Sequence, residues 1–198
     1  KKAVPFWTKV RGSFSELTKL YGTPILRNRA IICHFVWATT SLVYYVTALN
    51  VSNFKANKIV YVASTGVVDT LGYAGSIVVL KYLGRKNTSF MLYVISGTSL
   101  LAIFLVPKEM SLVIIILSML ARFAITAVYA VLTLHTSELF PTEIRNSALG
   151  ICSTSSHFGS VLAPYVVDLL GNISWHYPTT VCGFIIMIAG GLTLLHPE

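Results

Sequence analysis

Charged residues are scarce in this chain of 198 residues. Lys, Arg, Asp and Glu together make up 11% of it, whereas a soluble globular domain carries about 25%. Apolar residues make up 55%, and the mean hydropathy is +0.73. A soluble fold of this size could not use so much apolar surface, so we expect the excess to face lipid. The composition therefore predicts an all-α, polytopic membrane protein.

Residues that serve catalysis or metal binding are also sparse. The three cysteines, Cys33, Cys152 and Cys182, all fall inside apolar stretches, without a CxxC pair or the spacing of metal ligands. We expect buried free thiols. Because no Ser/His/Asp set, metal box or phosphate-binding loop is visible, the sequence predicts no enzyme, no cofactor and no metal site.

Acidic residues are too few near the N-terminus to balance its positive charge. Seven of the 15 Lys and Arg residues lie in the first 29 positions, where only Glu16 opposes them. Large apolar side chains recur there at steps of three and four residues, which predicts a basic amphipathic helix lying on a membrane surface within residues 1–28. Since this patch precedes an apolar span, positive-inside charge explains it better than nucleic acid, which we do not expect as a partner.

Six apolar stretches approach the length of about 20 residues that a helix needs to cross a membrane. They lie near 30–49, 59–80, 88–106, 111–134, 147–170 and 178–195. With residues 1–28 inside, eleven Lys and Arg residues lie on the cytosolic side and three in the outer connectors, which predicts that both ends are cytosolic. We divide the chain into a cytosolic segment, 1–28, and a six-helix transmembrane domain, 29–198.

Polar residues recur at helical spacing in four of the spans. The polar side of a membrane helix faces the interior of a bundle or a water-filled cavity. The four polar faces are His34, Trp37, Ser41 and Tyr44; Gly66, Asp69, Tyr73 and Ser76; Ser118, Arg122, Thr126, Tyr129 and Thr133; and Ser153, His157, Ser160 and Pro164. We therefore expect the first, second, fourth and fifth spans to line a shared cavity, with the third and sixth as outer supports.

Two ionisable residues, Asp69 and Arg122, lie deep within these spans. On insertion scales, each such residue at a helix centre costs about 2.5–3.5 kcal/mol, so both need partners or water. They form a structural ion pair in one interpretation and contact a substrate or coupling ion in the other. For His157 the alternatives are a hydrogen bond to a neighbour and a substrate contact. Trp37 and Tyr44 serve either helix packing or an organic cation or flat apolar solute.

The two predicted cytosolic connectors in the transmembrane domain carry charges of both signs. Charges on separate helix ends can form an ion-pair latch that closes the cytosolic gate in one state and breaks in the other. The residues expected to form this gate are Gly84, Arg85, Lys86, Glu138, Pro141 and Arg145. Ordinary positive-inside charge and helix capping are the alternative explanation.

Four segments of the sequence carry recognisable motifs: Ser137–Asn146, which reads Ser-Glu-Leu-Phe-Pro-Thr-Glu-Ile-Arg-Asn, Leu83–Lys86, Leu20–Arg29 and Leu194–Glu198. Together they resemble the major facilitator superfamily and, within it, the organic cation/anion/carnitine transporter family. The first segment is similar to the hallmark of that family after its tenth helix, and the second to the superfamily's loop between helices eight and nine. The third resembles the entry into helix seven, and the fourth the end of helix twelve.

The resemblance covers essentially the whole chain and implies helices seven to twelve. The N-terminal six-helix half of the same protein is then the missing partner. Trp37 and Tyr44 match aromatic positions of helix seven, Asp69 an acidic position of helix eight, and Arg122 a basic position of helix ten. His157 stands where cation transporters carry Asp and where anion and carnitine members carry Arg, so the charge preference stays open.

A second departure from the pattern is Lys81, because the superfamily loop usually has Asp at that position. The resemblance implies a carrier of small organic ions (a cation, an anion or a zwitterion such as carnitine) that works by alternating access in the plasma membrane. Substrate and lipid bilayer are then its partners. Sugar porters of the same superfamily, a truncated non-transporting membrane protein and a channel are the alternatives.

Overall fold

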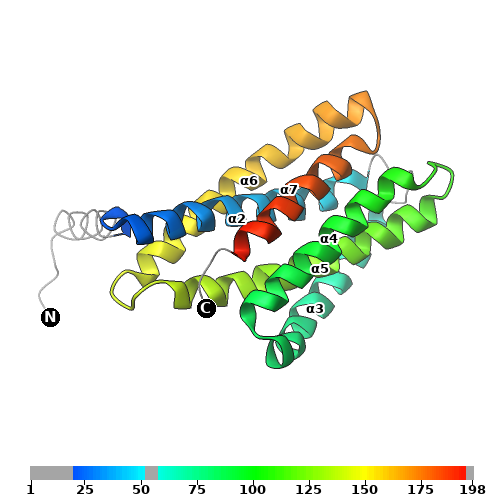
Figure 1. Ribbon diagram of the computed structural model, residues 1–198. Coiled ribbons are helices and arrows are strands. Elements are labelled where there is room, and N and C mark those ends of the chain that lie inside the picture. Colours follow the sequence, from blue (N-terminus) through cyan, green and yellow to red (C-terminus); the bar gives the residue numbers. More distant parts are fainter. Residues whose placement is uncertain (1–19, 52–57, 195–198) are drawn as a thin grey trace, which may run out of the picture.

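The chain folds into helices wherever the sequence predicts a span. The computed structural model describes residues 20–51 and 58–194, and these two ranges contain no strand. The elements in chain order are α2 (Pro24–Leu49), α3 (Lys58–Leu83), α4 (Arg85–Ala102), the short 3-10 helix η2 (Ile103–Leu105), α5 (Ser111–Leu139), α6 (Arg145–Ile173) and α7 (Tyr177–Thr193) (Figure 1). The all-α prediction is confirmed. The amphipathic helix predicted for residues 1–28 lies mostly outside the described residues.

The helices begin and end where backbone chemistry favours it. α2 starts with Pro24, which suits the first turn because a helix makes no use of the N–H group there. α3 and α4 are separated by Gly84 alone, which adopts a φ of 73°. Only glycine enters this left-handed region at little cost, which explains why Gly84 stands at this tight turn.

Several helices are longer than the apolar core of a bilayer. Among the described residues, four stretches are long and apolar enough to cross a membrane: Pro24–Leu49, Ile59–Leu83, Arg85–Leu105 and Ser111–Leu139. α6 has 29 residues but is more polar, and α7 has 17. At 1.5 Å per residue, a helix of 29 residues reaches about 43 Å, which exceeds a hydrocarbon core of about 30 Å. The charged ends of α5 and α6 can therefore project beyond the lipid.

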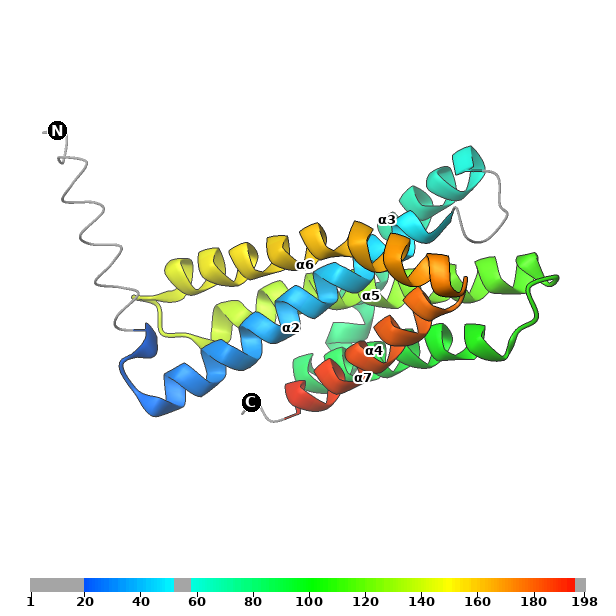
Figure 2. The same ribbon diagram turned by 90° about the horizontal axis from the view of Figure 1, so that it is seen from above.

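The bundle has two groups of three helices that meet along α4 and α7. α2 packs mainly on α6 and also on α7, while α5 packs on α3 and α4 (Figure 1). Seen from above, α6 and α7 lie on opposite sides of α2 (Figure 2).

Inside the bundle, the hydroxyl of the fully buried Tyr93 lies 2.8 Å from Thr40 Oγ1. Thr40 already donates to the Val36 carbonyl, so Tyr93 is the donor of this bond.

A glycine sets the distance between α2 and α6. A Cβ atom on Gly159 of α6 would overlap the backbone carbonyl of Ala38 in α2. Small residues permit such close approach in membrane bundles. Because the obstacle is backbone rather than a flexible side chain, the two helices cannot keep this spacing with a larger residue at 159.

Apolar side chains remain exposed on every long helix of the described chain. Examples are Ile59 and Ile77 on α3, Leu112 on α5 and Phe158 and Leu169 on α6, which are each more than half exposed. Exposed apolar surface on this scale fits a surrounding of lipid or of further helices. The three cysteines are buried, as the sequence predicts, and none of them forms a disulfide with another described residue.

Candidate functional site

Asp69 and Arg122, the charges predicted deep within the spans, bind each other. Asp69 projects from α3 and Arg122 from α5. Arg122 donates from Nε to Asp69 Oδ1 at 3.0 Å and from Nη2 to Oδ2 at 2.8 Å. This two-pronged geometry is the strongest arrangement of a guanidinium and a carboxylate. The Arg122 side chain is 5% exposed and that of Asp69 is 18% exposed, so little water screens the pair.

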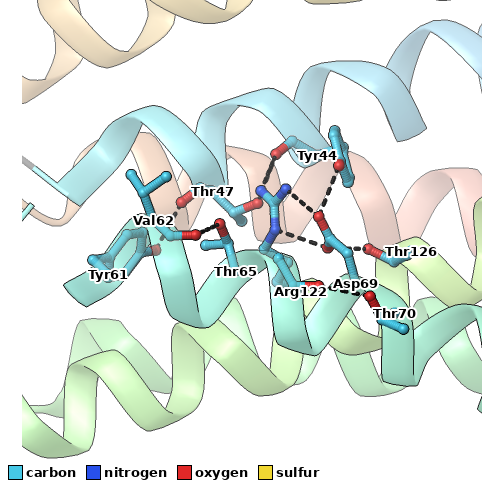
Figure 3. A network of polar contacts seen from close by, with 10 residues as sticks. Tyr44, Thr47, Tyr61, Val62, Thr65, Asp69, Thr70, Arg122 and Thr126 are labelled. Atoms are coloured by element: carbon cyan, nitrogen blue, oxygen red, sulfur yellow. Dashed lines mark hydrogen bonds and ion pairs between the residues drawn. The ribbon is translucent and has the colours of Figure 1, made fainter. Parts of the chain in front are cut away.

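Neighbouring groups form further hydrogen bonds with both partners of the pair. Thr126 Oγ1 donates to Asp69 Oδ1 at 2.8 Å, and the Tyr44 hydroxyl donates to Oδ2 at 2.9 Å. Arg122 Nη1 donates to the backbone carbonyl of Tyr44 at 3.0 Å. Figure 3 shows that these groups come together from α2, α3 and α5. We call Tyr44, Asp69, Arg122 and Thr126 the charge network.

Aromatic rings extend the charge network along α2 and α5. The Arg122 guanidinium carbon lies 4.2 Å from the centre of the Tyr44 ring, which is a cation–π distance. The Tyr129 ring packs edge-on against both Tyr44 and Trp37, with centroid distances of 6.2 and 5.7 Å. Trp37 Nε1 donates to Thr136 Oγ1 at 3.0 Å. Trp37 is buried, whereas Tyr44 and Tyr129 are half-buried and can contact a solute.

The structure places His157 apart from this set. Its side chain is exposed on α6 and has no hydrogen-bond partner among the described residues. Its backbone carbonyl accepts a bond of 2.8 Å from Ser160 Oγ. Four of the five predicted substrate residues, Trp37, Tyr44, Asp69 and Arg122, thus lie together, and His157 faces outward from the bundle.

A second histidine joins α2 to α6 instead. His34 Nε2 lies 2.7 Å from the Tyr21 hydroxyl and Nδ1 lies 3.1 Å from Ser155 Oγ. Because Ser155 donates to the Ile151 carbonyl, the consistent arrangement has Nδ1–H donating to Ser155 and the Tyr21 hydroxyl donating to Nε2. Partial burial of the phenol raises the pKa of Tyr21. His34 is on the predicted polar face but is already occupied by these two partners.

Tyr61 and Thr136 also belong to the polar interior, although neither is part of a polar face predicted from the sequence. The Tyr61 hydroxyl donates to the Thr47 carbonyl at 2.8 Å and lies 2.9 Å from Ser118 Oγ. Both residues continue predicted polar faces, since Tyr61 lies two turns before Asp69 and Thr136 one turn after Thr133. Extending each polar face by one or two helical turns along the sequence would have included them.

The predicted gate residues form one ion pair across two connectors. Arg85, at the start of α4, pairs with Glu138, near the end of α5. The Arg85 and Glu138 side chains are 42% and 47% exposed. Exposed ion pairs contribute only about 0.2–1 kcal/mol to folding stability. Arg145 is not part of this pair, and its buried Nε has no hydrogen-bond partner in the described part of the chain. Pro141 is exposed in the turn before α6.

The helices and the charge network define a class of protein. Apolar helices that expose apolar side chains and keep a compensated charge pair inside form an integral membrane protein with several spans. The chain belongs to the Major Facilitator Superfamily, whose family model matches residues 30–198. The predicted family is thereby confirmed, and the described helices form one half of a major facilitator fold.

Curated relatives carry transporter names. Over 175 residues the chain is 35% identical to the organic cation transporter protein of Drosophila melanogaster. This alignment covers 88% of the chain and 32% of the relative. It is also 32% identical over 179 residues to organic anion transporter 3 of Oryctolagus cuniculus and to solute carrier family 22 member 4 of Mus musculus. Each of these two alignments covers 90% of this chain. These alignments cover 33% and 32% of the relatives, so the chain spans about a third of their length.

Proposed function

We propose that this chain forms one half of a secondary transporter that moves small organic ions across a membrane by alternating access. The observation that carries this proposal is the charge network, a paired acid and base with half-buried aromatic rings inside a membrane bundle. The names of the relatives support organic cations and anions over sugars as the solute class. They also support transport over catalysis.

The network suggests how a charged solute is accommodated. Asp69 is the more accessible partner of the ion pair, and the same helix exposes Tyr73 one turn further on. A solute that approaches from this uncovered side of α3 meets a carboxylate, a phenol and an aromatic ring. In the proposal, the second six-helix half covers this side, and the solute binds between the two halves near the middle of the membrane.

The proposed orientation follows the distribution of basic residues. Residues 1–28 and the C-terminal end lie in the cytosol, and the protein resides in the plasma membrane. The Arg85–Glu138 pair then lies at the cytosolic mouth, where it closes the path in the outward-facing state. Residues 1–28 form the cytosolic segment and residues 29–198 the transmembrane domain.

Uptake by the full-length gene product tests the proposed function. Proteoliposomes or expressing cells are offered labelled organic cations, organic anions, zwitterions and hexoses. Saturable accumulation of at least one class of organic ion is the expected result. Accumulation of hexoses alone supports the sugar-porter alternative, and absence of any accumulation by a correctly folded, surface-exposed protein contradicts transport.

A substitution at position 157 tests the charge preference. His157→Asp adds a negative charge on an exposed side of α6, so cation uptake is expected to rise relative to anion uptake. A charge contact on the order of 1 kcal/mol corresponds to a change of about fivefold in this ratio. His157→Asn, which has nearly the same shape as Asp without the charge, is the matched control. An unchanged ratio in both variants removes His157 from the proposed site.

The gate is tested by breaking and reversing its ion pair. Glu138→Gln is expected to slow transport measurably but by no more than about fivefold, because an exposed pair contributes about 0.2–1 kcal/mol. The charge exchange Arg85→Glu/Glu138→Arg restores the attraction and should restore part of the rate. Glu143→Gln removes an exposed carboxylate from the same connector and serves as control. Equal rates in Glu138→Gln and the wild type contradict the latch.

A further inference from the structure

A cavity opens at the end of the bundle where α2 and α4 begin and α5 ends. It has a volume of about 430 Å³ and is lined by Arg29, Arg85, Lys86, His135 and Glu138, together with Gly84 and Leu139. Three elements that are far apart in sequence contribute to its wall. One carboxylate and three Lys or Arg side chains share this small space, so its net formal charge is positive.

Two of these cations have no counterion among the residues that the structure describes. Glu138 pairs with Arg85, whereas Arg29 and Lys86 have neither an ion pair nor a side-chain hydrogen bond in the described part of the chain. Both are partly buried, which removes some of the water that would otherwise solvate their charge. An anion that binds between them would replace this lost solvation.

The backbone at the cavity favours the same sign of ligand. α4 begins immediately after Gly84, its first turn contains no acidic residue, and no side chain caps its N-terminus. The N–H groups of a helix start carry partial positive charge and bind phosphates and other anions. Gly84, Arg85 and Lys86 therefore contribute this backbone end to the cavity as well as two side chains.

We propose that this cavity binds the phosphorylated headgroup of an anionic membrane lipid. Its volume falls in the range of small-molecule sites, about 300–1,000 Å³, and leaves room for more than a single inorganic ion. Basic pockets between membrane helices at the cytosolic surface suit phosphoinositide or other anionic headgroups. The sequence before α2 adds Lys1, Lys2, Lys9, Arg11 and Lys19, which attract anionic lipid to this side of the membrane.

Binding of such a headgroup has a consequence for the gate. The phosphate competes with the Glu138 carboxylate for Arg85 and repels that carboxylate. An occupied cavity therefore weakens the pair that joins α4 to α5. The assignment to the cytosolic leaflet rests on the proposed orientation, but the binding itself does not.

A binding titration with matched variants tests the site. The full-length gene product is placed in nanodiscs of phosphatidylcholine and titrated with dioctanoyl phosphatidylinositol 4,5-bisphosphate, with affinity read by thermophoresis. Saturable binding is expected, and Arg29→Gln/Lys86→Gln should weaken it about 30-fold. The control Lys81→Gln/Lys108→Gln removes the same charge from exposed positions outside the cavity and should leave the affinity unchanged.

Two further ligands separate the possible sources of the phosphate. If inositol 1,4,5-trisphosphate or inorganic phosphate binds as tightly as the lipid, the cavity still takes phosphate, but from a soluble solute. If only the lipid binds, the membrane is the source. Absence of saturable binding by all three ligands, or equal weakening by both double variants, overturns the proposal.

A loss of binding can be distinguished from misfolding of the variant and from failure of the proposed transport function. If Arg29→Gln/Lys86→Gln elutes as aggregate, Lys86→Gln alone is expected to weaken binding about fivefold, since it removes one of the two cations that have no ion pair within 20–51 and 58–194. An unchanged affinity in that variant also overturns the proposal. Because both nanodisc leaflets are accessible and no uptake is measured, a negative result leaves the proposed transport function intact.

Discussion

Replacing Arg122 with Met is expected to abolish organic-ion uptake and to lower the melting temperature of the purified protein. The substitution leaves the Asp69 carboxylate inside the bundle without its guanidinium partner. Breaking a buried ion pair by removing one partner typically costs about 3–5 kcal/mol. The melting temperature can be read from a fluorescence-detected thermal scan, and uptake from proteoliposomes that contain equal amounts of protein.

A double variant separates the structural role of the pair from its proposed contact with substrate. Asp69→Asn/Arg122→Met removes both charges, so no charge is left unpaired in the membrane and much of the melting temperature should return. Uptake should remain low if Asp69 or Arg122 contacts the solute. Recovery of both stability and uptake would identify a purely structural pair. Wild-type uptake in Arg122→Met alone would contradict any role of the network.

Replacing Gly159 with Ala is expected to be the most damaging change outside the charge network. The added methyl group collides with the Ala38 carbonyl, so α2 and α6 must separate along their extensive contact. Overpacking a close contact usually costs about 1–3 kcal/mol, and a backbone obstacle should place this substitution at the upper end. The same thermal scan measures the effect.

Gly150 provides the matched control on the same helix. A Cβ atom there meets no other atom within 4 Å. Since Ala is favoured over Gly within a helix by up to about 1 kcal/mol, Gly150→Ala should leave stability unchanged or raise it. Equal losses at positions 150 and 159 would show that neither loss comes from the contact with α2.

Helical spacing in the sequence predicts much of the charge network, but not its pairing. A repeat of three and four residues identifies the polar side of each span, and it correctly groups Tyr44, Asp69, Arg122 and Thr126 among inward-facing positions. It does not identify the neighbouring helix on that side. Asp69 becomes the partner of Arg122 because α3 packs on α5, and this packing joins residues that are 53 positions apart in the sequence.

Charges in the connectors were harder to assign from sequence. The sequence groups Arg85, Glu138 and Arg145 in one gate, but it does not say which of these charges pair. In the structure Glu138 pairs with Arg85, because the end of α5 lies beside the start of α4. His157 shows the same limit, since its spacing on α6 matches the other polar residues while its side chain faces outward.

The distance in sequence between Asp69 and Arg122 has a consequence for biosynthesis. Asp69 leaves the ribosome 53 residues before Arg122, so α3 enters the bilayer while its carboxylate has no counterion. The penalty of about 2.5–3.5 kcal/mol for that Asp is offset by the Val, Ile and Leu residues of α3, at about 0.3–0.6 kcal/mol each. The guanidinium then arrives with α5, which makes lateral association of already inserted helices the step at which the acid is neutralised.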